Sequence, residues 1–166
     1  AAGAGGNLFG LLIPGLGEIE IFEPIAQQIT RELQRRRHTA LLGDSSEGAG
    51  DGRQAEELGD RYVERRVAGV FFAPLELTEK KDVVNRRILE KLDRARIPVV
   101  LLDRDIVRYP ERSRYDLVSI DHRRAAHLLT RHLLDLGCRR IDFAARPLSA
   151  ATVALRIAGY QEALME

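Results

Sequence analysis

The chain has 166 residues, of which 45% are hydrophobic and 31% are charged, a composition that suits one folded domain, or one and a fraction. Its 26 basic and 25 acidic side chains leave a formal net charge of +1, which gives no standing attraction to nucleic acid or to an anionic membrane. The one cysteine, Cys138, excludes an internal disulfide and fits a reducing compartment. No apolar run approaches the roughly 20 residues that a membrane-spanning helix needs.

The opening residues, 1–6, have neither the basic nor the apolar segment of a signal peptide, although a processed protein would also lack them. We expect a linker here, or residues left from cloning.

Short apolar runs alternate with amphipathic stretches along the rest of the chain. The apolar runs predict strands at 8–14, 39–46, 67–75, 97–103, 116–121 and 139–146. The stretches between them predict helices at 21–37, 53–66, 79–95, within 122–138, and at 152–165. We expect Thr78 and Asp121 to cap two of these helices, and Gly137 to follow the end of one.

Strands that alternate with helices, each strand a short continuous apolar run, predict a mostly parallel sheet built from βαβ units. Right-handed crossovers then favour a doubly wound α/β sandwich of the flavodoxin or Rossmann kind. Ligands of such sheets bind outside the carboxyl ends of the strands. The run "VVLLDRD" (99–105) ends on charged residues at that edge, so these side chains must be exposed, paired or used for binding.

The common motifs of catalysis and of cofactor binding are absent from the sequence. It contains no Gly-x4-Gly-Lys-Ser/Thr loop, no dinucleotide fingerprint and no Gly-x-Ser-x-Gly elbow. The first predicted strand is not followed by the acids of a receiver-type Mg²⁺ site, and Asp103 with Asp105 lacks a third convergent ligand. We therefore predict no catalytic residue, no metal site and no cofactor.

What remains is a set of polar and aromatic side chains at or after the ends of predicted strands. They are Glu18, Glu20, Phe22, Asp44, Ser45, Ser46, Glu76, Asp103, Arg104 and Arg146, with Arg156 inside the last helix. Carboxylates and planar guanidinium groups with an aromatic ring bind neutral polyols through bidentate hydrogen bonds and stacking. Because no pair is poised for acid–base work, binding explains this set better than catalysis.

Four stretches together resemble the effector-binding domain of LacI/GalR-family transcriptional regulators, whose fold is shared by type I periplasmic sugar-binding proteins. They are "FGLLIPGL" (9–16), "IPVVLLDR" (97–104), "VSIDHRRAAHLLTRHLLDLGCRRI" (118–141) and "TVALRIAGYQEAL" (152–164). The resemblance implies two Rossmann-like lobes with an effector in the cleft between them. Residues 7–120 would form the N-terminal lobe, and 121–166 the beginning of an incomplete C-terminal lobe.

The resemblance also implies a set of ligand-binding residues. Asp103 matches the cleft acid at the end of the fourth strand, with Arg104 beside it. Arg156 matches the arginine of Arg-x-Ala-Gly-Tyr, which reaches the ligand from the second lobe and would be the partner of Asp103 across the hinge. Glu20 and Phe22 lie in the segment that matches the first-strand loop, where an aromatic or polar contact is usual.

The hinge falls on Asp121 and His122, where the family usually has Asp-Asn. Further departures are Cys138, in place of a histidine after the glycine, and Ala154, in place of an arginine.

Simpler structural roles are open for several residues. Asp103 and Arg104 could form a surface ion pair, Asp121 could be only a helix cap, and Asp105 is expected to face solvent in a loop.

Taken together, the residues and the resemblance predict the sugar-sensing part of a bacterial transcriptional regulator. Its partners would be a small polar effector, DNA through a helix-turn-helix domain absent from this chain, and a second copy in a homodimer, with no membrane partner and a cytoplasmic location. The alternatives are a periplasmic sugar-binding protein of a transporter and, less favoured, an α/β sugar-modifying enzyme.

Overall fold

The computed structural model describes residues 7–13, 21–43 and 52–166. A five-stranded sheet has the order β2-β1-β3-β4-β5, and all its neighbouring strands are parallel. The strands are β1 (Leu8–Leu12), β2 (Thr39–Leu42), β3 (Gly69–Phe72), β4 (Val99–Leu102) and β5 (Asp116–Val118). The helices are α1 (Phe22–Arg35), α2 (Arg53–Glu64), α3 (Lys81–Arg94), α4 (His122–Asp135) and α5 (Ala151–Met165). The prediction of a doubly wound parallel sheet is confirmed.

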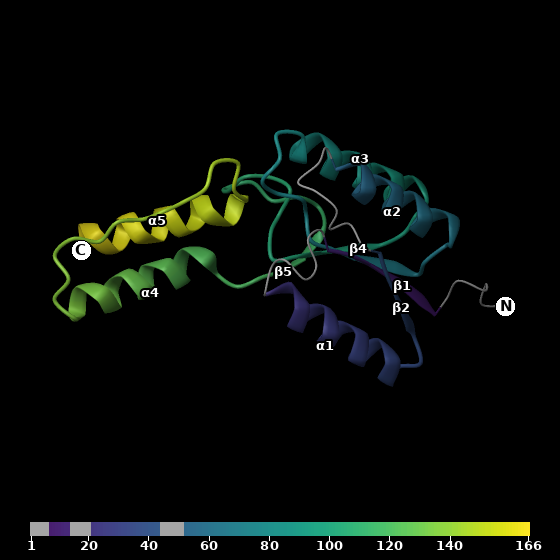
Figure 1. Ribbon diagram of the computed structural model, residues 1–166, viewed down its shortest axis with the longest axis horizontal. Coiled ribbons are helices and arrows are strands. Elements are labelled where there is room, and N and C mark those ends of the chain that lie inside the picture. Colours follow the sequence, from purple (N-terminus) through teal and green to yellow (C-terminus); the bar gives the residue numbers. More distant parts are fainter. Residues whose placement is uncertain (1–6, 14–20, 44–51) are drawn as a thin grey trace.

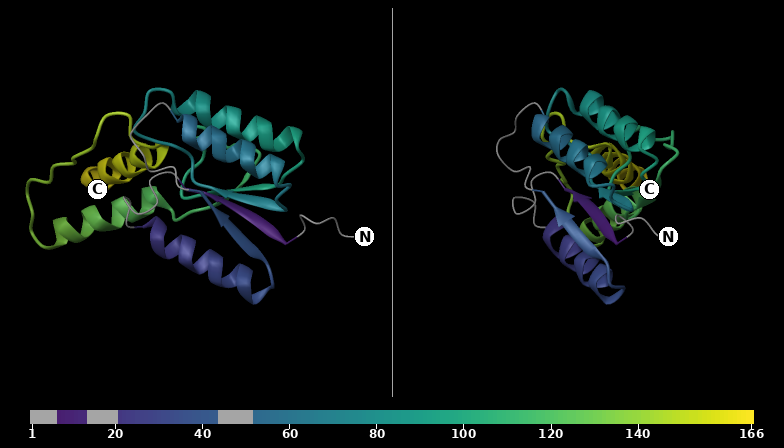
Figure 2. Two further views of the ribbon diagram at one scale, coloured as in Figure 1. Left: turned by 45° about the vertical axis from the view of Figure 1, so that its right-hand side comes forward. Right: turned by 90° about the vertical axis from the view of Figure 1, so that its right-hand side faces the viewer.

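Helices cover both faces of this sheet, with α1 on one face and α2 and α3 on the other (Figures 1 and 2). Successive residues of β1 serve the two layers in turn, as the period of a strand requires. Leu11 and Ile13 pack with Phe22 and Leu33 of α1, whereas Leu12 packs with the residues of α2 and α3. The carboxyl ends of the strands are thereby held at one edge of a well-packed sandwich.

Tyr62 of α2 fastens its helix to the first two strands. The fully buried hydroxyl donates to the carbonyl oxygen of Leu11 at 2.6 Å and lies 3.1 Å from that of Leu41. A Cβ atom at Gly10 would come within 2.7 Å of the Tyr62 ring, so glycine is required at that position of β1. Burial raises the pKa of the Tyr62 phenol above its ordinary value of 10.0.

We expect Tyr62→Phe to lower the free energy of unfolding by about 1–2 kcal/mol, because the buried carbonyl of Leu11 loses its side-chain donor. The variant should also change the response to alkaline pH. Above pH 10 the unfolded phenol releases its proton while the folded one keeps it, so this group costs stability as pH rises, by up to about 1.4 kcal/mol per pH unit. Urea unfolding from pH 8 to 11 should therefore show a shallower loss in the variant; equal slopes would contradict the assignment.

Four helices end in the same left-handed turn. The residue after each C-cap has a positive φ: 60° at Arg37, 50° at Arg66, 58° at Arg96 and 86° at Gly137. In each turn the next residue donates its backbone N–H to the carbonyl five positions back, as His38 does to Leu33. The prediction for Gly137 is confirmed, but arginine occupies the equivalent position after α1, α2 and α3.

Two local predictions are wrong. Residues 139–146 form no strand, because no strand among the described residues pairs with them; the Tyr160 hydroxyl instead donates to the Ile141 carbonyl at 2.6 Å. Thr78 does not cap α3, which begins at Lys81 after Lys80 as N-cap. The strands are also shorter than the apolar runs, as in β4, which covers Val99–Leu102 of the predicted 97–103.

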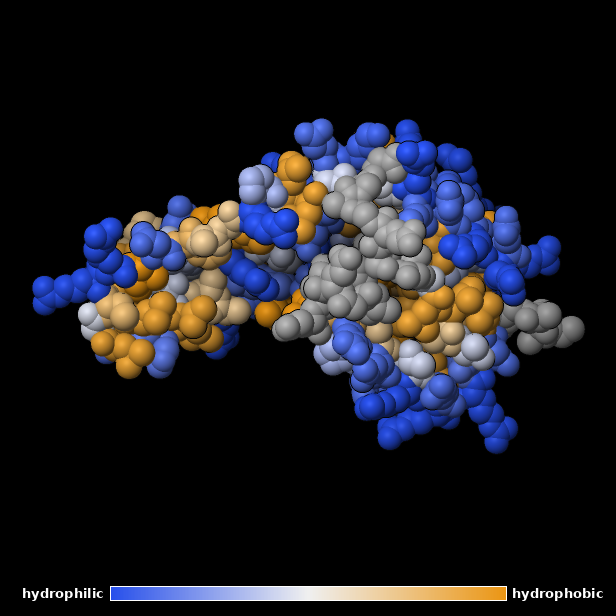
Figure 3. All heavy atoms as spheres, viewed as in Figure 1, coloured by the Kyte–Doolittle hydropathy of each residue, from blue (hydrophilic) through white to orange (hydrophobic). Residues whose placement is uncertain are grey.

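Helices α4 and α5 form an antiparallel hairpin to one side of the sheet (Figure 1). Gly159 permits their close approach, because an added Cβ would overlap the carbonyl oxygen of Arg123. Apolar side chains gather on the visible face of this hairpin (Figure 3). Leu129, Leu136 and Met165 are among its exposed hydrophobic residues. Within the described ranges, no helix has the length and apolar character needed to cross a membrane.

Candidate functional site at the end of β4

The chain turns sharply at Asp103, directly after β4. Asp103 has a φ of 66°, and the N–H of Arg104 donates to the carbonyl of Leu102 at 2.7 Å, which closes a three-residue turn. The N–H of Asp103 donates to Val118 of β5 at 2.8 Å. A left-handed backbone is uncommon for a residue other than glycine, and such conformations concentrate at functional sites.

Arg104 is buried with its charge compensated. Its side chain is 5% exposed, with Nη1 2.5 Å from Oε1 of Glu76 and Nε 3.3 Å from Oδ2 of Asp103. The guanidinium carbon lies 5.3 Å above the centre of the Phe22 ring. The simpler interpretation of Asp103 and Arg104 as a surface ion pair is therefore wrong, because two carboxylates and an aromatic ring enclose the guanidinium.

Glu76 connects this guanidinium to the hairpin. While one carboxylate oxygen pairs with Arg104, the other accepts the backbone N–H of Ala150, the N-cap residue of α5, at 3.1 Å. Lys81 adds to this junction, since its ammonium donates to the carbonyls of Leu148 and Ser149. The segment that leads into α5 is thus held by groups that follow β3.

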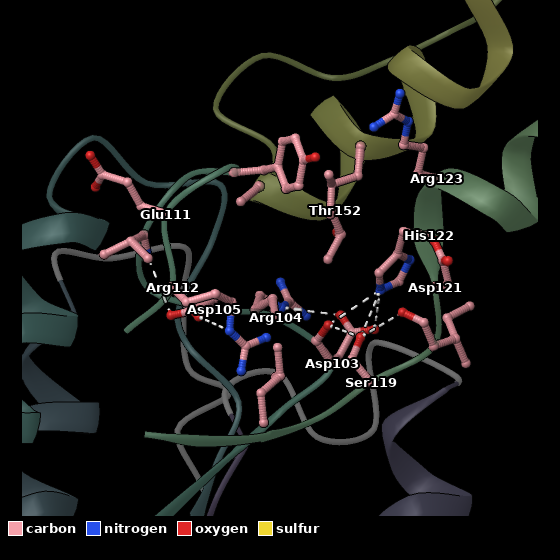
Figure 4. Close-up of a pocket in the computed structure, with 16 residues that line it drawn as sticks. Asp103, Arg104, Asp105, Glu111, Arg112, Ser119, Asp121, His122, Arg123 and Thr152 are labelled. Atoms are coloured by element: carbon pink, nitrogen blue, oxygen red, sulfur yellow. Dashed lines mark hydrogen bonds and ion pairs between the residues drawn. The ribbon is translucent and has the colours of Figure 1, made fainter. Parts of the chain in front are cut away.

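His122 makes a second connection between the sheet and the hairpin. The ring is 3% exposed, and its Nε2 lies 3.2 Å from the carbonyl oxygen and 3.4 Å from Oδ1 of Asp103 (Figure 4). Its Nδ1 accepts the Nε–H of Arg156 from α5 at 3.2 Å. The sequence pattern predicts a hinge at His122, but nothing in it indicates that one ring would contact both Asp103 and Arg156.

Ser119, His122 and Asp103 lie together but are not arranged as a nucleophilic triad. The Ser119 hydroxyl, 3.1 Å from His122 Nε2, is 2.5 Å from the Asp103 carbonyl, to which it donates. Arg156 occupies Nδ1, the position that an orienting carboxylate takes in a triad. The histidine therefore presents no free basic nitrogen to the hydroxyl.

The structure brings some predicted ligand-binding residues together and separates others. Arg156 contacts Asp103 only through His122, which corrects the expected direct pairing. Phe22 is 1% exposed, and its ring packs against the guanidinium of Arg104. In this structure the ring therefore offers no surface to a ligand. Glu20 lies outside the described residues.

The remaining two acids have defined structural roles. Asp121 caps α4 by accepting the N–H of Arg124 at 2.9 Å, which confirms the predicted cap. Asp105 does not simply face solvent, as was expected; its carboxylate accepts the N–H groups of Ile106 at 2.7 Å and Ser113 at 3.1 Å. It therefore organises the loop between β4 and β5.

A cavity of about 470 Å³ opens between this loop and the start of the hairpin (Figure 4). Asp103 and Arg104 line it from the end of β4 and His122 from the start of α4, with Tyr109 from the loop and Thr152 from α5. The described part of the chain holds no group of three or more side chains that could bind a metal ion. What the cavity offers is a polar wall of charged and imidazole groups beside an aromatic ring.

No protein-family profile matches the sequence. An uncharacterized HTH-type transcriptional regulator of Streptomyces limosus is 32% identical over 160 residues, which are 96% of this chain and 43% of the regulator. The chain therefore spans less than half the length of this relative.

Solved structures agree with this relationship. The transcription regulator CcpA of Lactococcus lactis has a TM-score of 0.76 at 24% identity, over 96% of this chain and 53% of its own. A LacI family transcriptional regulator from Enterococcus faecium with bound ribose has a TM-score of 0.73 at 23% identity, over 95% and 52%. The resemblance to the LacI/GalR family is confirmed. The LacI-type fold accounts for the parallel sheet and for the hairpin that follows it.

Proposed function

We propose that the chain is the effector-sensing part of a transcriptional regulator and binds a sugar, or a related polar metabolite, beside the end of β4. The observation that carries the proposal is the set of polar contacts that joins Asp103 and Arg104 to α5 through Glu76 and His122. A ligand that contacts these groups would bias the placement of the hairpin relative to the sheet. An effector switches a regulator only if it binds one arrangement of the protein more tightly than the other.

The proposed organisation has a first lobe at 7–120, a hinge at Asp121 and His122, and a second lobe that starts at 121. The exposed apolar side chains of the hairpin support it, because a face of this kind normally packs against further structure. Asp103, Arg104 and Arg156 are the proposed ligand contacts, and Phe22 holds Arg104 in place. DNA binding through a helix-turn-helix domain, a homodimer, a cytoplasmic location and the absence of enzymatic activity complete the proposal.

The test is calorimetric titration of the protein with a panel of neutral sugars, sugar phosphates and nucleosides. We expect at least one ligand, and we expect Asp103→Asn to weaken its binding by about 10- to 100-fold, because a charged hydrogen-bond acceptor is lost. Asparagine tolerates the left-handed conformation at this position, so the turn should survive. The control is Asp116→Asn, which neutralises an exposed carboxylate at the start of β5, the end of this strand that does not contact Asp103.

Unchanged affinity in Asp103→Asn would remove this residue from the site. Turnover of any sugar in the panel that is lost in Asp103→Asn would favour an enzyme instead, and the absence of any ligand would refute the sensor.

A further inference from the structure

His122 contacts α5 with one ring nitrogen and the segments that follow β4 and β5 with the other. Nδ1 faces the Nε–H of Arg156, and Nε2 faces the carbonyl and carboxylate oxygens of Asp103 and the hydroxyl of Ser119. We propose that His122 is a positioning residue that fixes the Arg156 guanidinium for ligand binding through its Nδ1 atom. This inference rests on the proposed function, since it concerns the same site.

The hydrogen bonds determine the form of the ring. An arginine Nε always carries a hydrogen and never accepts, so Nδ1 of His122 must be the unprotonated acceptor. The ring proton then lies on Nε2, where the Ser119 hydroxyl oxygen at 3.1 Å, the Asp103 carbonyl at 3.2 Å and its Oδ1 at 3.4 Å can accept it. The neutral Nε2–H form satisfies both ring nitrogens at once, and the opposite tautomer would leave two donors facing each other at Arg156.

His122 and Arg156 differ in how firmly the protein holds their side chains. His122 is buried at the first residue of α4, where Asp121 caps the helix. Arg156 is exposed, and within the described residues its one polar side-chain contact is the hydrogen bond to His122. A long exposed arginine loses considerable rotamer freedom when a ligand fixes it, and a partner that fixes it beforehand removes that cost from binding.

The contact uses Nε alone and leaves both terminal nitrogens of the guanidinium for another acceptor. These are the atoms that make paired hydrogen bonds to vicinal hydroxyls or to a carboxylate. His122 thus sets the direction of Arg156 and leaves its terminal nitrogens, which lie beyond the residues that line the cavity, available to a ligand that extends past it. Because the same ring holds the Asp103 carbonyl, the positions of Arg156 and of the turn at Asp103 depend on each other.

Two substitutions separate the two sides of the ring. The amide of asparagine lies near the position of Nδ1, so His122→Asn keeps an acceptor for Arg156 and loses the contact to Asp103. The amide of glutamine lies near Nε2, so His122→Gln keeps the donor to Asp103 and leaves Arg156 without its acceptor. His132→Asn and His132→Gln, at an exposed position of the same helix, are matched controls.

The first readout needs no ligand: the Nε–H resonance of Arg156 in the NMR spectrum and its rate of exchange with solvent. We expect a protected signal in the parent protein, in His122→Asn and in both controls, and rapid exchange in His122→Gln. The same signal in His122→Gln as in the parent would overturn the proposal, and so would equal loss in both His122 variants.

The second readout is affinity for whichever sugar of the calorimetric panel the parent protein binds. We expect His122→Gln to bind about tenfold more weakly and His122→Asn to retain most of the affinity. Equal affinities in both variants and the parent would refute the positioning role while leaving the sensor intact. If the parent binds no member of the panel, the sensor fails, and the exchange rates still decide the role of His122.

Discussion

Replacing Arg104 with methionine is expected to lower the free energy of unfolding by about 3 kcal/mol. The substitution keeps most of the side-chain volume but leaves the carboxylates of Glu76 and Asp103, which are 21% and 14% exposed, without their shared cation. Removing one member of a buried ion pair is costly because the remaining charge stays desolvated. Urea denaturation followed by circular dichroism measures the change.

Arg94→Met is the matched control, because Arg94 pairs with Glu90 at the surface with its side chain 80% exposed. It should change stability by less than about 0.5 kcal/mol. Adding Glu76→Gln to Arg104→Met should recover part of the loss, since a neutral amide can still accept the N–H of Ala150. A loss below about 1 kcal/mol in Arg104→Met would show that water reaches the guanidinium and that the pair is not buried in solution.

Gly159→Ala is expected to separate α4 from α5 and to cost about 2–4 kcal/mol, despite the better helix propensity of alanine. The added Cβ would overlap the carbonyl oxygen of Arg123 and would lie 3.0 Å from the backbone nitrogen of His127. Backbone atoms cannot move aside as a flexible side chain can, so the helices must shift. Thermal unfolding and chemical-shift changes confined to α4 and α5 would record the effect.

Gly137→Ala provides the comparison. At Gly137 a Cβ meets nothing within 4 Å, and only the positive φ of 86° opposes alanine, so the expected cost is about 1 kcal/mol. Comparison of the two variants separates steric overlap from backbone strain. If Gly159→Ala proved no worse than Gly137→Ala, the close packing of α4 on α5 would be contradicted.

The sequence was sufficient to predict the sheet and the position of Asp103. Short apolar runs bounded by charged residues and glycines identify buried parallel strands, and "VVLLDRD" did so for β4 and for the charged residues at its carboxyl end. The capping role of Asp121 was equally readable, because a cap depends on residues within one helical turn.

Predictions that depended on distant partners fared worse. Residues 139–146 have the composition of a strand, but a strand also needs a neighbour to receive its hydrogen bonds. Arg156 and Asp103 are connected through His122. These residues are far apart in the sequence, so no local pattern shows that the histidine lies between the other two. Asp105 resembled a solvated loop residue because one of its two backbone N–H donors, Ser113, lies eight residues further along the chain.

The arginines at the left-handed helix ends also distribute charge unevenly over the molecule. In a parallel α/β sandwich the C-termini of the helices lie at the edge where the next strands begin, so the exposed side chains of Arg37, Arg66 and Arg96 collect there. At the opposite edge the carboxylates of Glu76 and Asp103 are paired with Arg104. A formal net charge of +1 therefore does not describe the edge that carries these three guanidinium groups. An approaching polyanion would meet more attraction at that edge than the average charge implies.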